Sequence, residues 1–200
     1  MPIRVDIYSD YVCPYCVLFA AVLDTAAHDL DVEIAWKPVE LRPYPAPTLR
    51  PEDDYLPSVW ESSVYPLAQA LDVPLKLPSV SPQPYSRLAH EGARFAALAG
   101  KADEYHVRVF SAFFEDDRDI GDLDVLTSVA GEVGLAPDEF RAALVSGRFT
   151  SAHEDALQEA GRLGIHSVPS VFINSRPMAL TYDVDSLRAQ LRSNEFMGSE

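Results

Sequence analysis

Cysteine is scarce in this chain, and its scarcity excludes two kinds of site. The 200 residues contain two cysteines, Cys13 and Cys16. A structural zinc site needs four ligands, usually supplied as two Cys/His pairs, and the five histidines show no spacing that would complete such a set. A second redox-active cysteine pair is excluded for the same reason. We therefore expect no metal, and any thiol chemistry has to use this one pair.

Positive charge and long apolar runs are also in short supply. The chain has 16 Lys and Arg against 31 Asp and Glu, which gives a formal net charge of −15. Such a surface repels phosphate backbones and anionic membranes, so we expect neither nucleic acid nor a membrane as a partner. No apolar run approaches the roughly 20 residues that span a bilayer. The N-terminus has no charged-then-apolar leader, and together these absences predict a cytoplasmic protein.

The first 38 residues show the pattern of a βαβ unit. Residues 3–8 alternate apolar and polar side chains and predict a strand, and residues 32–36 predict a second one. Between them, residues 14–30 place apolar side chains at helical spacing on more than one face. Because a strand, a helix and a strand follow one another so closely, we expect the two strands to be parallel.

The middle of the chain changes character twice. Most of the sixteen prolines lie between residues 38 and 84, so only a short helix at 58–71 is expected there, limited by Pro66. Helical periodicity then dominates residues 86–163 and predicts five helices. The first is lined by Leu88, Phe95 and Leu98, and the second by Val109, Phe110, Phe113 and Phe114. A third runs through Leu123, Leu126, Ala130 and Val133, a fourth lies between Pro137 and Gly147, and a fifth opens at a Ser151–Glu154 capping box and stops at Gly164.

Strand character returns near the C-terminus. Residues 168–173 predict a strand, residues 178–180 a short partner strand after a turn at 174–177, and residues 186–192 a last helix capped by Asp183 or Asp185. We therefore expect residues 1–40 and 165–193 to form one discontinuous domain. Residues 41–164 would be an insertion, with a proline-rich segment followed by a helical lid, and residues 194–200 a flexible tail.

The position of the cysteines favours a redox centre. A disulfide across three residues removes little unfolded-state entropy, so a structural staple is a poor explanation. Two thiols that merely help to fill a buried helix remain an alternative. However, Cys13 falls where the first strand has ended, and Pro14 suits the first helical position. A thiol there faces unpaired backbone N–H groups and the positive end of the helix dipole, which stabilise a thiolate. Cys16, one turn further, is placed to attack a mixed disulfide formed at Cys13.

The sequence resembles a known superfamily at these residues. Cys13-Pro14-Tyr15-Cys16 after a first strand, with "SVPSVFIN" at residues 167–174, resembles the thioredoxin superfamily, and the helical insertion resembles its DsbA-type subgroup. The segments "VDIYSDYVCPYC", "YHVRVFSAFFEDDRDIGD" and "GIHSVPSVFIN" are similar to FrnE-type DsbA-like oxidoreductases, often called polyketide-biosynthesis-associated dithiol isomerases. The resemblance implies an α/β thioredoxin fold with a large helical insertion and a disulfide oxidoreductase or isomerase without a bound cofactor.

The resemblance also implies roles for matching residues. Cys13 takes the place of the attacking cysteine and Cys16 that of the resolving one. Pro169 takes the place of a cis-proline that faces them, and Val168 offers backbone hydrogen bonds to a substrate strand. The chain departs from the family at Thr181-Tyr182-Asp183, where a Gly-Ala-Gln-like turn is common before the last helix.

The Pro-Tyr dipeptide between the cysteines bears on the direction of electron flow. It is also found in glutaredoxins, whose potentials lie at about −200 to −230 mV. In a cytosol poised at about −220 mV or lower, such a pair stays mostly reduced. We therefore predict a reductase or isomerase that acts on disulfide-containing proteins or small thiols. Glutathione, as a co-substrate, or a thioredoxin-type protein would recycle it.

Several assignments stay open at this point. Asp6 on the first strand and Asp10 in the following turn are candidate proton acceptors for Cys16. His90, Glu91 and Arg94 fit satisfied core or surface groups better than substrate contacts. One alternative function is a kappa-type glutathione-dependent isomerase or transferase, a class that shares this fold and typically has serine where Cys13 stands. Another is a non-enzymatic, chaperone-like protein that binds peptides.

Overall fold

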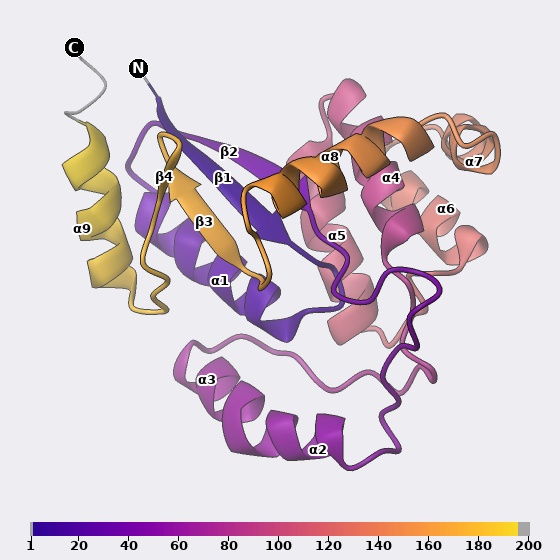
Figure 1. Ribbon diagram of the computed structural model, residues 1–200, viewed down its shortest axis with the longest axis horizontal. Helices are drawn as coiled ribbons and strands as arrows, with labels where there is room; N and C mark the ends of the chain where they lie inside the picture. Colours follow the sequence, from indigo (N-terminus) through magenta and orange to yellow (C-terminus); the bar gives the residue numbers. More distant parts are fainter. Residues whose placement is uncertain (1, 196–200) are drawn as a thin grey trace.

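A four-stranded sheet lies at the centre of the computed structural model, which describes residues 2–195 (Figure 1). Its strands are β1 (Ile3–Ser9), β2 (Val32–Pro38), β3 (Ser170–Ile173) and β4 (Arg176–Pro177), in the order β2-β1-β3-β4. β1 is parallel to β2 and antiparallel to β3, with Ile7 opposite Trp36 on one side and Val171 on the other. The two ends of the chain therefore meet in one sheet, and the predicted parallel pair is confirmed.

Two helices cover one face of this sheet. The odd-numbered side chains of β1 pack against α1 (Pro14–Ala27) and α9 (Val184–Glu195), in a core that includes Val5, Ile7, Phe19, Val22 and Leu187. Because side chains alternate along a strand, the even-numbered Asp6 and Tyr8 point to the other face. α8 (Thr150–Arg162) covers that face from the β2 side.

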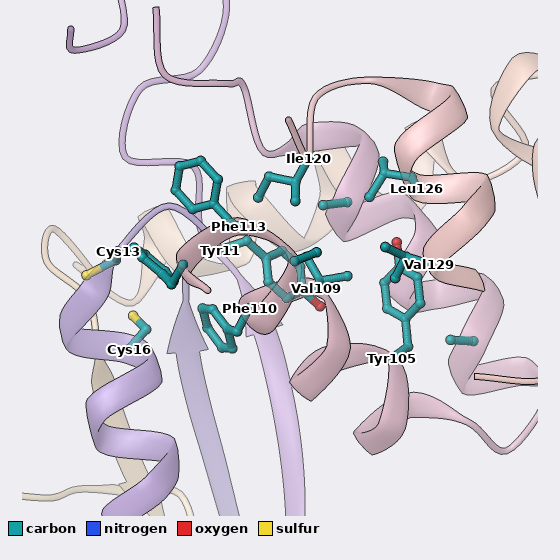
Figure 2. Close-up of a cluster of buried hydrophobic side chains, with 14 of the residues drawn as sticks. Tyr11, Cys13, Cys16, Tyr105, Val109, Phe110, Phe113, Ile120, Leu126 and Val129 are labelled. Atoms are coloured by element: carbon teal, nitrogen blue, oxygen red, sulfur yellow. The ribbon is translucent and has the colours of Figure 1, made fainter. Parts of the chain in front are cut away.

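The remaining helices lie between β2 and β3 in the sequence. They are α2 (Tyr55–Val59), the π-helical segment η1 (Trp60–Val64), α3 (Tyr65–Ala70), α4 (Arg87–Leu98), α5 (Ala102–Phe114), α6 (Leu123–Glu132) and α7 (Pro137–Val145). α4 to α7 pack on one another beside the sheet, while α2 and α3 lie below the start of α1 in Figure 1. The phenylalanines of α5 are buried in a second core that also contains Tyr11, Cys13 and Cys16 (Figure 2). The cysteine segment thus joins the sheet to the helices.

The proline-rich segment holds more helix than its sequence indicates. Helical structure begins at Tyr55, three residues before the predicted start, and passes Pro66 without ending. The Tyr65 N–H bonds to the carbonyl of Trp60, five residues earlier, so the chain makes a π turn just before the proline. Pro66 is the second residue of α3 and directly follows this wider turn, so the helical run continues past the proline. The prediction that Pro66 limits this helix was wrong.

Other element predictions were wrong in detail. Leu98 is 72% exposed, because the buried face of α4 consists of Ala89, His90, Glu91, Gly92 and Ala96. α8 begins at Thr150 with no side-chain cap, so Ser151 lies inside the helix instead of capping it.

The boundaries of three further elements also differ from the prediction. The partner strand is Arg176–Pro177, not residues 178–180, because Asn174 and Ser175 alone make the turn with φ values of 49° and 65°. α1 ends at Ala27, three residues early, since the chain turns to begin β2. α9 starts two residues early with Asp183 as its cap, and it runs to Glu195, so residues 194 and 195 of the predicted tail are helical. Residues 196–200 lie outside the described part of the chain.

The close contact at Gly92 gives a test of how the helices pack. A Cβ atom at Gly92 would lie 2.2 Å from the hydroxyl of Tyr105 and 2.7 Å from the ring of Phe140. We expect Gly92→Ala to lower the free energy of unfolding by about 1–3 kcal/mol through overpacking. Urea unfolding measures this loss.

Gly161→Ala is the matched control, because a Cβ at Gly161 in α8 meets nothing within 4 Å. We expect it to leave the free energy of unfolding unchanged or to raise it by about 0.5–1 kcal/mol. Equal effects of the two substitutions would contradict the packing of α4 on α5 and α7.

Candidate functional site

The two cysteines lie where the chain leaves β1 and enters α1. The Cys13 N–H donates to the Asp10 carbonyl at 3.1 Å, which closes a tight turn after Ser9. Pro14 then occupies the first helical position, where its fixed φ and missing N–H suit a helix start. Cys13 is the residue before the helix, and Cys16 follows one turn later with its N–H bonded to the Cys13 carbonyl. This is the placement expected from the sequence.

The Cys13 thiol contacts the loop that precedes β3. Its Sγ lies 3.7 Å from the carbonyl oxygen of Val168, to which the S–H donates. The peptide bond between Val168 and Pro169 is cis. Cys13 makes no side-chain hydrogen bond to the first N–H groups of α1, unlike the arrangement that we expected. In the thiol form the sulfur carries a proton, so a carbonyl is the better partner.

Cys13 opens into a pocket, whereas Cys16 does not. The pocket has a volume of about 160 Å³ and lies between the start of α1 and the segment that carries α2 and η1. Arg42 and Gln83 contribute polar groups to a lining that is otherwise mostly apolar, including Val12, Leu49, Leu56, Val59, Trp60 and Phe114. Cys16 has no exposed surface and lies behind Cys13, at the edge of the aromatic cluster in Figure 2. A molecule in the pocket therefore meets Cys13 first.

Burial dominates the electrostatics of Cys16. It raises the pKa of the Cys16 thiol well above its ordinary value, and the neighbouring Cys13 raises it further. The nearby Ser9 side chain and the backbone of Asp10 act in the opposite direction and lower this pKa. Cys16 is consequently protonated at neutral pH in the dithiol protein.

The two acids proposed as proton acceptors lie in different places. The Asp6 carboxylate lies on the sheet face opposite α1 and pairs with Arg4 at 3.1 Å, so the structure does not bring it to the cysteines. Asp10 is 1% exposed, and its carboxylate accepts the backbone N–H of Leu41 at 2.7 Å. Within residues 2–195 neither carboxylate makes a hydrogen bond to Cys16. The geometry therefore favours neither side chain as a direct acceptor.

The sequence analysis missed the role of Tyr182 in holding this segment. Its hydroxyl donates to the carbonyl of Tyr15, between the two cysteines, at 3.3 Å. Burial raises the pKa of Tyr182, and the nearby Cys16 and Cys13 raise it further, so the phenol stays neutral. The signal in the sequence was the departure at residues 181–183 from the family's usual turn.

Buried polar groups tie the helices to the turn before Cys13. His90 Nε2 in α4 lies 3.7 Å from the Asp10 carboxylate, and Glu91 accepts a hydrogen bond from Thr150 in α8. His153 in α8 bonds to Glu40 at 2.7 Å. Glu91 is a satisfied core group, as expected, but His90 Nε2 and Arg94 Nε have no hydrogen-bond partner in the described structure, so for these two residues the expectation was wrong. Within residues 2–195 no three His, Cys, Asp or Glu side chains are grouped to hold a metal ion, and no helix is long and apolar enough to cross a membrane.

The pKa of Cys16 can be tested in isolation. Cys13→Ser leaves Cys16 as the only thiol, and burial, the largest cause of the shift, remains. We expect the rate of alkylation by iodoacetamide to rise about tenfold per pH unit through pH 9 without a plateau, because only the thiolate reacts. Mass spectrometry follows the modification. Limited access of iodoacetamide to Cys16 lowers the alkylation rate by the same factor at every pH, so it does not change the pKa that the pH profile gives.

A cysteine in a short unstructured peptide provides the control, since its rate levels off above its ordinary thiol pKa of about 8.5. A plateau for Cys16 at or below the same pH would show that burial does not govern this thiol.

Comparison with known proteins places the chain in a family. The model of the DSBA-like thioredoxin domain matches residues 4–192. An uncharacterized protein of Bacillus subtilis (strain 168), YwbO, is 43% identical over 177 residues, which cover 86% of this chain and 88% of YwbO.

Two solved structures have the same fold at low sequence identity. A probable DsbA oxidoreductase from Streptomyces coelicolor has a TM-score of 0.79 and 20% identity, over 99% of this chain and 91% of that one. The cytosolic disulfide reductase DsbM from Pseudomonas aeruginosa, also solved with GSH, has a TM-score of 0.70 and 18% identity, over 97% and 99% of the two chains. The predicted α/β thioredoxin fold of the DsbA-like type is confirmed. The chain belongs to the family of DSBA-like thioredoxin domains.

Proposed function

We propose that the chain is a thiol–disulfide oxidoreductase of the FrnE type that reduces or isomerises disulfides in the cytoplasm. Cys13 is the attacking residue and Cys16 the resolving one. The observation that carries this assignment is the difference in accessibility between the two thiols. Cys13 lines the pocket and contacts the Val168 carbonyl, whereas Cys16 is fully buried behind Cys13. Family membership supports the reaction class, and the positions of Cys13 and Cys16 support their separate roles.

The first step is attack on a substrate disulfide in the pocket. Cys13 loses its proton, and its sulfur forms a bond to one substrate sulfur while the substrate S–S bond breaks. The departing sulfur leaves as a thiolate and takes up a proton. When Cys13 gives up its own proton, the Val168 carbonyl loses the S–H donor that it has in the dithiol state. That carbonyl is then free to accept a backbone N–H of a bound substrate strand.

The second step releases the substrate. Cys16 loses its proton, attacks the Cys13 sulfur and breaks the mixed disulfide, so that the second substrate sulfur leaves as a thiol. The substrate has gained two electrons and two protons, and the protein holds a Cys13–Cys16 disulfide. Two glutathione molecules restore the dithiol and become glutathione disulfide. In isomerisation a second substrate thiol attacks the mixed disulfide instead, and the protein leaves as the dithiol.

Two observations support the reducing direction. The protein DsbM, which shares the fold, is a cytosolic disulfide reductase that has been solved with GSH. The Pro14-Tyr15 dipeptide matches that of glutaredoxins, whose potentials lie at about −200 to −230 mV. Because Cys13 lines the pocket and Cys16 is fully buried, a small thiol such as glutathione can reach Cys13 but not Cys16. The recycling thiol would therefore react at Cys13.

A redox titration with an activity assay tests the proposal. We expect the Cys13–Cys16 pair to equilibrate with glutathione buffers at about −200 to −230 mV, and the protein to catalyse insulin reduction by glutathione. Cys13→Ser should abolish catalysis, and Cys16→Ser should accumulate a mixed disulfide with glutathione, visible by mass spectrometry. A potential near −120 mV would reverse the direction to oxidation. A pair that never forms a disulfide would remove the proposed function.

The same variants separate the two alternatives. Glutathione-dependent activity that survives Cys16→Ser would favour a kappa-type isomerase or transferase, which needs no resolving thiol. Suppression of aggregation that persists after both cysteines are replaced, with no reductase activity in the unmodified protein, would favour a chaperone-like role.

A further inference from the structure

A second cavity lies along β2, between the sheet and the helices α4, α5 and α8. It has a volume of about 340 Å³, within the range of small-molecule sites. Its floor is formed by β2 and by Tyr8 and Ser9 of β1, and its walls by α4, α5 and α8. The cavity exists because these helices present small side chains to the sheet, namely Ala93, Ala97, Ala102 and Ala156.

This cavity is separate from the pocket at Cys13. The two share no lining residue, although they lie on either side of the same segment of chain. Ser9 and Tyr11 line the second cavity, whereas Asp10 and Val12 line the cysteine pocket. Residues 8, 9 and 11 therefore face one cavity, and residues 10, 12 and 13 face the other. The second cavity is not an extension of the redox site.

Arg94 is the unusual charged group in this cavity. Most arginines of a protein with net charge −15 have acidic partners at hand, but no acidic partner of Arg94 is found within residues 2–195. Its side chain is half-buried, and its Nε is enclosed without a hydrogen-bond partner in the described structure. Because an enclosed polar atom is normally hydrogen-bonded, the unpaired Nε beside a cavity indicates that the partner comes from outside the chain.

The other charges around the cavity leave Arg94 as its main cationic group. Lys37 lies 4.0 Å from Asp6, which is already paired with Arg4. Glu159 is exposed to solvent, so its opposing charge is screened. Burial lowers the pKa of His106 well below its ordinary value, so this ring is neutral near pH 7.

Aromatic rings supply the rest of the lining. The Trp36 ring stacks on His106 with centroids 3.6 Å apart, and His106 Nδ1 bonds to the Tyr11 hydroxyl at 3.1 Å. These contacts hold the rings in place, and Tyr8 lies beside them in the same cavity. Rigid rings next to one guanidinium suit a ligand with an apolar body and one anionic end.

From this arrangement we infer that the cavity binds a small organic carboxylate with an aromatic or apolar body. The carboxylate pairs with the guanidinium of Arg94, for which bidentate hydrogen bonding is the preferred geometry. The apolar body packs against Trp36 and the four alanines. This inference does not depend on the redox chemistry, because no cysteine lines the cavity.

The two tryptophans of the chain make the inference directly testable. Trp36 lines the second cavity and Trp60 lines the cysteine pocket, so their indole N–H signals in a ¹H–¹⁵N spectrum report on the two sites separately. We expect titration of the reduced protein with phenylacetate to shift the Trp36 signal saturably and to leave the Trp60 signal in place. Movement of Trp60 alone, or no saturable shift, would overturn the assignment.

Matched ligands and variants test the two halves of the site. Phenylacetamide, which lacks the charge, and acetate, which lacks the ring, should each bind at least tenfold more weakly than phenylacetate. Arg94→Gln should weaken phenylacetate binding at least tenfold, whereas Arg162→Gln, on the exposed end of α8, should leave it unchanged. Ala156→Leu should also abolish binding, because it fills the cavity without changing charge. Equal binding to Arg94→Gln and Arg162→Gln would contradict the inferred role of Arg94.

Discussion

The pairing of β1 with strands from both ends of the chain is the constraint on which this structure depends. β1 bonds to β2 on one side and to β3 on the other, so residues more than 160 positions apart become neighbours. This pairing sets Val168 against Cys13, since each lies just beyond the end of its strand at the same edge of the sheet. A loss of register between β1 and β3 would therefore separate the thiol from the loop that faces it.

The helical insertion is packed into the site and does not merely lie over it. Tyr11, Cys13 and Cys16 belong to the same core as Phe110 and Phe113 of α5. Asp10 meets His90 of α4, and Tyr11 meets His106 of α5. The short turn between β1 and α1 is thus fixed by contacts from both halves of the fold. This explains why the chain keeps polar side chains buried there: they hold a turn that carries the reactive residues.

Much of this arrangement could be predicted from the sequence, but only where the signal was local. The strand-to-helix junction at Cys13 could be predicted because Pro14 and the alternating β1 residues mark it. The phenylalanines of α5 could be placed because helical spacing shows a single apolar stripe. The buried face of α4 could not, since the partners of His90 and Glu91 lie in the turn after β1 and on α8, and the sequence does not reveal these contacts. Tyr182 was missed for the same reason: its partner, the Tyr15 carbonyl, is 167 residues away. The π turn at Trp60 depends on the position of Pro66 relative to the following helix, which spacing alone does not give.

The burial of Cys16 has a consequence for how long an enzyme–substrate adduct would persist. In the proposed mechanism the mixed disulfide at Cys13 has two exits, attack by Cys16 or attack by another thiol of the substrate. A resolving thiol that ionises reluctantly makes the first exit slow and leaves more time for the second. Acidic conditions would lengthen that dwell time and alkaline conditions would shorten it. The burial of Cys16 would then determine what fraction of the substrate leaves isomerised and what fraction leaves reduced.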